Sequence, residues 1–183
     1  MDLNKVLVEN RLVIAEKWLD AVLSTYHKDG ARFFKKQQDR FANPLGYSAR
    51  TGLEKMVKVI AEGGELEVSA ELKQFIKLRA VQEFTPAKAL AFIYDLKPIM
   101  LEVCAKETEQ MDLNRWFQVE SQIDSLALLV FDLYMAAREL IHKVKYEELR
   151  SGNAGVVAGG CPSGAVIHKH NAEKMELKVL RDC

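Results

Sequence analysis

The apolar positions at the start of the chain recur every three or four residues. Between residues 3 and 26, charged side chains separate the apolar ones, which are Val6, Val13, Ile14, Trp18, Val22 and Leu23. This spacing predicts an amphipathic helix that presents one stripe to a core. No stretch of useful length shows the period of two that is typical of a half-buried strand. The pattern therefore predicts an all-α fold.

Residues that favour helix ends divide the following sequence into further helices. A second, shorter helix is predicted over residues 30–40, with Phe33 and Phe34 inward. Asn43 can cap the next helix, and Pro44 fits the first helical position, where no hydrogen bond is lost. That helix is predicted to end at Gly63 and Gly64, and a further helix is predicted over residues 71–82. Thr85 and Pro86 mark the start of the next helix, and Asp112 can cap a last helix that reaches about Glu148. We expect one helical domain of about five to six helices.

The character of the sequence changes at Ser151. Residues 151–166 read "SGNAGVVAGGCPSGAV" and carry no charge. A segment so rich in glycine loses much backbone entropy on ordering and has few large side chains to offset that loss. We therefore predict a helical domain over residues 1–150 and a flexible Gly-rich tail, containing Cys and His, over residues 151–183.

The overall composition restricts the classes of partner. The 26 Lys and Arg residues balance 26 Asp and Glu residues, so the chain lacks the basic footprint of a general nucleic-acid binder or of a membrane anchor. Its most apolar run, Leu126–Ala137, is too short to span a bilayer, and its charged N-terminus does not resemble a signal peptide. Three unevenly spread cysteines are not a secreted disulfide framework. We predict a cytoplasmic protein that binds no nucleic acid and does not insert into a membrane.

Four blocks of sequence carry a resemblance to a known family. They read "EKWLDAVLSTY", "ARFFKKQQDRFANPLGYSARTGLEKM", "IKLRAVQEFTPAKALAFIYDLK" and "IDSLALLVFDLYMAARELI". In this order and spacing they resemble the RsbRD N-terminal domain family, the sensory half of stressosome co-antagonist proteins. The resemblance covers roughly residues 5–150, and "DRFANPLG" with "LRAVQEFTP" is its most specific part.

The resemblance implies a globin-like helical domain that is dimeric and holds no haem. In stressosome proteins this domain precedes a phosphorylatable STAS domain that restrains a switch kinase. No segment after residue 150 of this sequence resembles a STAS domain, so the kinase-restraining output is not carried over. As a free-standing copy of this domain, the sequence resembles proteins that are encoded near the membrane complex of dissimilatory sulfur metabolism. That resemblance implies an accessory role for such a complex.

Arg40, Asn43 and Arg50 crowd around one predicted helix start. Two guanidinium groups at a helix N-terminus suit an anion, which the free backbone amides there also favour. In the alternative interpretation, the arginines pair with carboxylates such as Asp39 or Glu54, and Asn43 serves only as a cap. The cap and the proline already account for the most distinctive residues, which favours a structural corner.

Asp124 and Asp132 are the notable polar residues of the last predicted helix. Asp132 interrupts an apolar run, and a buried carboxylate needs a partner or a raised pKa. Arg79 and Arg50 are the candidate partners, and such a polar spot in a helical cavity suits a small ligand. The alternatives are an Asp that faces solvent or one held in a structural salt bridge.

The predicted tail holds Cys161, His168, His170 and Cys183. Two thiols and two imidazoles match the ligand types of zinc, although their spacing fits no familiar zinc motif. A reversible Cys161–Cys183 disulfide is a second hypothesis, and two unremarkable thiols are the third.

The sequence contains no recognisable catalytic motif. It has no Gly-rich phosphate loop, no HExxH, no CxxC and no nucleophile elbow. His142, near the end of the last predicted helix, has no defined partner, so we predict no haem and no other cofactor. We predict a non-catalytic sensory or regulatory module that forms a homodimer, binds a protein partner and responds to a small ligand. The alternative is a redox or metal-binding accessory protein that works through the Cys161/Cys183 tail.

Overall fold

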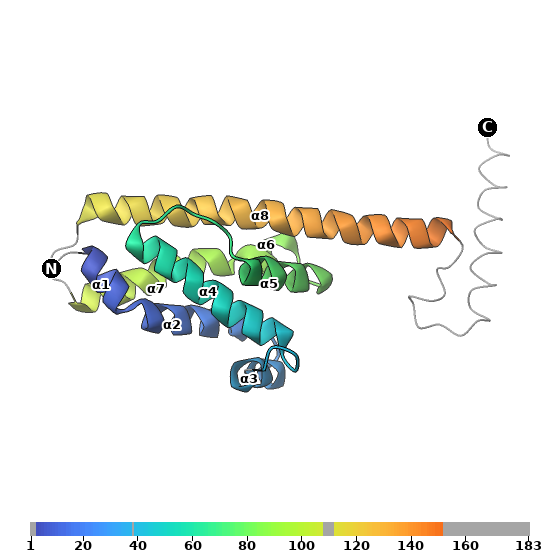
Figure 1. Ribbon diagram of the computed structural model, residues 1–183, viewed down its shortest axis with the longest axis horizontal. Coiled ribbons are helices and arrows are strands. Elements are labelled where there is room, and N and C mark those ends of the chain that lie inside the picture. Colours follow the sequence, from blue (N-terminus) through green and yellow to red (C-terminus); the bar gives the residue numbers. More distant parts are fainter. Residues whose placement is uncertain (1–2, 38, 108–111, 152–183) are drawn as a thin grey trace. The chain divides into compact units, whose positions relative to one another are not determined.

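The computed structural model describes residues 3–37, 39–107 and 112–151, and every regular element within these ranges is an α-helix. The predicted all-α fold is therefore confirmed. The helices, drawn in Figure 1, are α1 (Leu3–Glu9), α2 (Arg11–Ser24), α3 (Lys28–Lys36), α4 (Pro44–Glu62), α5 (Ala70–Val81), α6 (Pro86–Leu90), α7 (Phe92–Glu107) and α8 (Leu113–Arg150).

The chain divides into two compact units. The first ends at Ala137 and the second begins at Arg138, so the last part of α8 belongs to the second unit. The domain boundary expected near residue 150 stays a prediction. All contacts discussed below lie within the first unit.

The core of the first unit is built around α2. This helix packs against both α4 and α7, and α4 packs in turn against α5 and α1. Trp18 of α2 is fully buried, and its indole nitrogen donates a 2.6 Å hydrogen bond to the carbonyl oxygen of Phe92. The first part of α8 buries one face, and the buried apolar residues of that face include Trp116, Val119, Ile123, Leu126, Val130 and Tyr134.

Most predicted helix ends are present in the structure. The Asn43 side chain accepts a hydrogen bond from the Gly46 amide, and Pro44 is the first residue of α4. Gly63 ends α4 in the left-handed region with φ 68°, where glycine has no steric penalty. Thr85 and Asp112 likewise accept hydrogen bonds from amides in the first turns of α6 and α8. These signals are local, which explains why the sequence alone predicted them.

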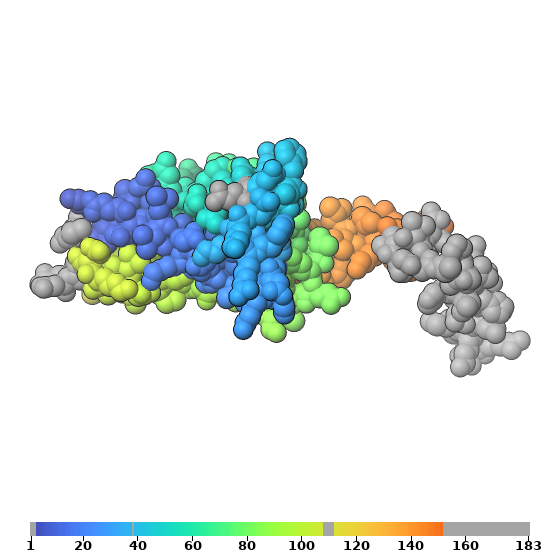
Figure 2. All heavy atoms as spheres, turned by 90° about the horizontal axis from the view of Figure 1, so that it is seen from below, coloured from blue at the N-terminus to red at the C-terminus, as the bar shows by residue number. Residues whose placement is uncertain are grey.

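Three predicted helices differ from the structure, and one of them, which starts at Thr85 and Pro86, is divided at Ala91 into α6 and α7. The segment expected to be one helix over residues 3–26 is divided at Asn10, whose side-chain amide donates to the Val6 carbonyl oxygen. Val13, predicted to face the core, is exposed. Phe33 is also exposed, because α3 lies on the surface and none of its residues is buried. Figure 2 shows α3 running across the surface of its neighbours.

No helix in the described ranges has a stretch both long and apolar enough to cross a membrane.

Two glycines let α4 approach its neighbours closely. A Cβ atom at Gly46 would overlap the Asn43 side chain and the Phe34 carbonyl oxygen. A Cβ atom at Gly52 would lie 2.8 Å from the backbone nitrogen of Leu72 and 2.9 Å from its Cα atom, in α5. Backbone atoms cannot move aside as the end of a flexible side chain can. The contact between α4 and α5 therefore depends on Gly52.

We predict that Gly52→Ala lowers the free energy of unfolding by about 1–3 kcal/mol, because the added methyl group forces α4 and α5 apart. This loss outweighs the better helix propensity of alanine. Gly30→Ala is the matched control, since a Cβ atom there would lie 3.6 Å from Phe34 Cε2, an ordinary contact. The control should be neutral or stabilising by up to about 1 kcal/mol. Urea denaturation of the three proteins measures both effects, and equal stability of Gly52→Ala and wild type would contradict the close packing.

Candidate functional site

Asn43 joins the end of α3 to the start of α4. Its side chain is buried, and Oδ1 accepts a 2.8 Å hydrogen bond from the Gly46 amide. Nδ2 donates to the carbonyl oxygens of Phe34, at 2.9 Å, and Gln37, at 2.6 Å. Both polar atoms of the amide are therefore used within the protein. Asn43 has a structural role in this corner.

Arg50 and Arg40, predicted together with Asn43 as an anion site, do not converge. Nη1 of Arg50 lies 2.8 Å from Oε2 of Glu16 in α2, and Nη2 donates to the Lys35 carbonyl oxygen. The partner of Arg50 is thus Glu16 rather than Asp39 or Glu54. Arg40 is exposed and lines a separate cavity of about 510 Å³ between the starts of α4 and α5.

Arg79 is fully buried between α2, α5 and α6. Nε donates to the Ala89 carbonyl oxygen at 3.0 Å, and Nη2 donates to the Lys88 carbonyl oxygen at 3.2 Å. Nη1 donates to the hydroxyl oxygens of Thr25 and Tyr26, both at 3.2 Å. The guanidinium carbon also lies 4.7–5.6 Å from the ring centres of Tyr26, Phe75, Phe84 and Phe92. Burial lowers the pKa of Arg79 below its ordinary value.

Of the two interpretations of Asp132, the structure matches the one in which this Asp faces solvent, and neither Arg79 nor Arg50 pairs with it. Asp132 is exposed on α8, and Arg79 uses neutral acceptors and aromatic faces instead. Asp124 is also exposed, and its Oδ1 lies 2.8 Å from Nζ of Lys97 in α7. The apolar run around Asp132 extends around the whole helix, but the core covers only one face of α8. Asp132 lies on an uncovered face and is exposed to solvent.

The tail residues Cys161, His168, His170 and Cys183 lie outside the described residues, so the zinc and disulfide hypotheses stay predictions. Within the described ranges no group of three or more His, Cys, Asp or Glu side chains could hold a metal ion. Cys104 is buried in α7, and burial raises the pKa of its thiol to about 11. Its thiol is therefore protonated at neutral pH and unreactive.

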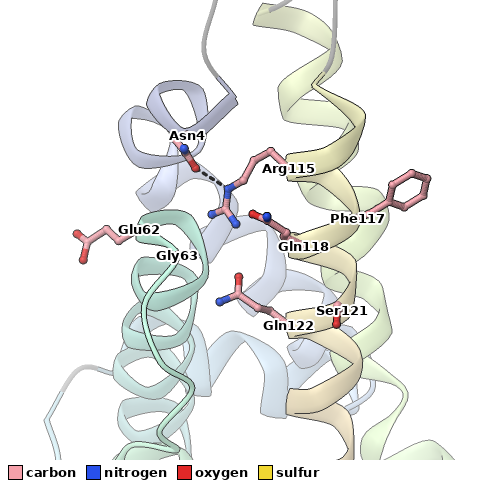
Figure 3. Close-up of a pocket in the computed structure, with 8 residues that line it drawn as sticks. All are labelled: Asn4, Glu62, Gly63, Arg115, Phe117, Gln118, Ser121 and Gln122. Carbon is pink, nitrogen blue, oxygen red and sulfur yellow. Dashed lines mark hydrogen bonds between the residues drawn. The ribbon is translucent and has the colours of Figure 1, made fainter.

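A cavity of about 650 Å³ lies where the first turns of α8 meet the end of α4. We call it the Arg115 cavity, and it is lined by Asn4, Glu62, Gly63, Arg115, Phe117, Gln118, Ser121 and Gln122. Figure 3 shows the Arg115 guanidinium and the Gln118 and Gln122 amides directed toward the end of α4. The side chains of Glu62 and Phe117 point away from this space.

Arg115 covers the carbonyl groups at the end of α4. Its side chain is nearly buried, with 8% exposed, and Nη2 donates to the carbonyl oxygens of Ile60 at 2.9 Å and Ala61 at 3.4 Å. Nε donates to Oδ1 of Asn4 at 2.5 Å, which ties α1 to the same point. A cation is favoured at a helix C-terminus, so this arrangement stabilises the junction of α1, α4 and α8.

Two polar groups at the Arg115 cavity have no partner among the described residues. Nη1 of Arg115 donates no hydrogen bond there, whereas Nε and Nη2 are both used. Oε1 of Gln122 is buried and accepts none, although Nε2 of the same amide donates to the Gly64 carbonyl oxygen at 3.0 Å. The cavity thus combines an unused cationic donor with an unused acceptor.

Sequence reasoning missed Arg115, although a signal for it exists. Arg115 is in register with Val119, Ile123, Leu126 and Val130, the buried stripe of α8. A charged residue at the first position of such a stripe indicates a buried cation at the edge of a core.

A comparison with protein families found one match. The family model described as "RsbT co-antagonist protein rsbRD N-terminal domain" matches residues 13–149, more than half of the chain. Comparisons with curated proteins and with solved structures found no match. The matched range contains Asn43, Arg79 and Arg115.

We expect Asn43→Ala to destabilise the protein by about 2–4 kcal/mol, because it removes a helix cap and takes the side-chain donor away from the partly buried carbonyl groups of Phe34 and Gln37. Asn114→Ala, in the exposed first turn of α8, should change the stability by less than about 0.5 kcal/mol. Thermal and urea unfolding followed by circular dichroism measure both variants. Comparable, small effects in the two variants would show that Asn43 does not hold the corner.

Proposed function

This chain belongs to the RsbRD N-terminal domain family, and on that premise we propose that it is a non-catalytic cytoplasmic module that acts through protein–protein contact. The family consists of stressosome-type sensory and regulatory domains and is not known for catalysis. The first partner in this proposal is a second copy of the chain, and a further protein partner receives the signal.

An apolar stripe on the outer face of α8 supports this proposal. Leu128 is 69% exposed, Phe131 is 45% exposed, and Met135 is partly exposed on the same side of the helix. We call these three residues the outer stripe. They are spaced by three and four residues, as in the seam between two paired helices. Apolar residues grouped on one side of a helix are typical of an interaction site, unlike apolar residues scattered singly.

A second copy is the occupant that the outer stripe suits best. In a two-fold dimer the same surface meets itself, so an apolar stripe on one copy faces an apolar stripe on the other. Asp124, which forms an ion pair with Lys97 of α7, lies one turn before Leu128, and the exposed Asp132 lies one turn after it, so both give the stripe a polar edge. An apolar centre with a polar rim is the usual anatomy of a protein interface.

We expect the full-length protein to be a dimer and Leu128→Glu/Phe131→Glu to be a monomer, because the double substitution places four carboxylates in the apolar seam. The dissociation constant should rise at least about 100-fold. Analytical ultracentrifugation over a concentration series measures this change.

Leu12→Glu is the control, since the exposed fraction of Leu12, 63%, is close to that of Leu128 but Leu12 lies on α2. It should leave the dimer intact, and circular dichroism should show that all variants keep their helix content. A monomeric wild-type protein, or a double variant that still dimerises, would count against the proposed interface.

A further inference from the structure

We propose that the Arg115 cavity binds a small carboxylate that also carries a hydroxyl group. The regulatory meaning of this site rests on the proposed function, while the binding itself is argued from the cavity alone. The carboxylate meets Nη1 of Arg115, and the hydroxyl group donates to Oε1 of Gln122.

The cationic half of the site follows from a comparison of the two most buried arginines. Arg79 and Arg115 both donate to backbone carbonyl groups at a helix end. All three nitrogen atoms of Arg79 donate within the protein, whereas Nη1 of Arg115 does not. Capping α4 needs only Nη2, and holding Asn4 needs only Nε. The remaining nitrogen therefore has no structural task in the described chain, and it belongs to a guanidinium that lines a cavity.

The charge of Arg115 favours an anion. No carboxylate of the described residues forms an ion pair with it, unlike Arg50, which pairs with Glu16. Glu62 lines the cavity, but its side chain points away from the guanidinium (Figure 3). The end of α4 supplies only about half a negative charge, so a net positive charge remains at the cavity. A carboxylate is a small organic anion that can accept a charge-assisted hydrogen bond from the one vacant nitrogen, Nη1.

The hydroxyl group follows from Gln122. A buried acceptor without a hydrogen bond costs about 1–3 kcal/mol, and native proteins rarely leave one unsatisfied. The position of the amide is set, because Nε2 donates to the Gly64 carbonyl oxygen and so directs Oε1 to the other side. A simple anion such as sulfate cannot donate to Oε1. A ligand that carries both an anionic group and a hydroxyl donor satisfies both vacant positions.

The position of the cavity links it to the outer stripe. Arg115 and Gln122 belong to α8, the helix that carries Leu128 and Phe131. Both side chains also bind the end of α4. A ligand that binds this junction favours one position of α8 relative to α4 over others. Binding in the cavity thereby changes the position of the outer stripe that a partner contacts.

The test uses the full-length protein with lactate as the probe. Propionate lacks the hydroxyl group and lactamide lacks the charge, so the three compounds separate the two halves of the proposed site. Thermal unfolding is measured at matched ionic strength, and affinity is measured by ligand-observed NMR. At a lactate concentration tenfold above Kd, the midpoint of unfolding should rise by about 3–6 °C. Propionate and lactamide should each bind at least about tenfold more weakly.

Gln122→Glu places a carboxylate inside the cavity beside Arg115, and we expect it to abolish lactate binding while the protein stays folded. Gln74→Glu, the same change at an exposed position of α5, should bind lactate as wild type does. Arg115→Lys keeps the charge, but its single nitrogen cannot hold Asn4, the α4 carbonyl groups and the carboxylate together, so it should bind at least about tenfold more weakly.

Equal binding of lactate, propionate and sulfate would overturn the hydroxyl assignment, and unchanged binding in Gln122→Glu would overturn the site. A wild-type protein that dimerises but binds no lactate refutes this inference and leaves the proposed function standing. A wild-type protein that is monomeric but binds lactate in the Arg115 cavity refutes the proposed dimer and supports this inference.

Discussion

The buried guanidinium of Arg79 is the interaction on which the first unit depends. It carries a charge into the core without a carboxylate partner among the described residues, so the fold must supply every compensating group. The hydroxyl groups of Thr25 and Tyr26 come from the end of α2, and the carbonyl groups of Lys88 and Ala89 come from α6. Four aromatic rings complete the surroundings. These elements cannot move apart without exposing an unsatisfied charge, which fixes their arrangement.

Two residues in the segments that most specifically resemble the family have structural roles. Asn43 lies in "DRFANPLG" and Arg79 lies in "LRAVQEFTP", and both are buried with their polar groups satisfied inside the protein. They hold helices together and leave no group for a signal. The features suited to recognition lie elsewhere, in the Arg115 cavity and in the outer stripe, and both belong to α8. Asn43 and Arg79 thus build the scaffold, and α8 carries both surfaces that we propose for recognition.

Local features were predictable from the sequence, and tertiary ones were not. Asn43, Pro44 and Gly63 mark helix ends through contacts within a few residues, so their pattern was sufficient. Val13 and Phe33 are apolar and at helical spacing, yet they are exposed, because burial depends on which neighbour covers each face. Arg79 was only one candidate partner for Asp132, and its actual partners are carbonyl groups, hydroxyl groups and aromatic rings, which no spacing rule reveals. The Arg115 cavity requires the end of α4 to meet the start of α8, and only the fold brings them together.

The most direct measurement of the central claim is the stability of Arg79→Lys. Lysine keeps the positive charge but cannot donate to four acceptors with the geometry of a planar fork. Urea denaturation, followed by far-UV and near-UV circular dichroism, should show a loss of at least about 3 kcal/mol in the free energy of unfolding. The near-UV signal should change most, because the lost contacts hold Tyr26 and the three phenylalanine rings around Arg79. A variant within about 1 kcal/mol of wild type would contradict the dependence of the fold on this guanidinium.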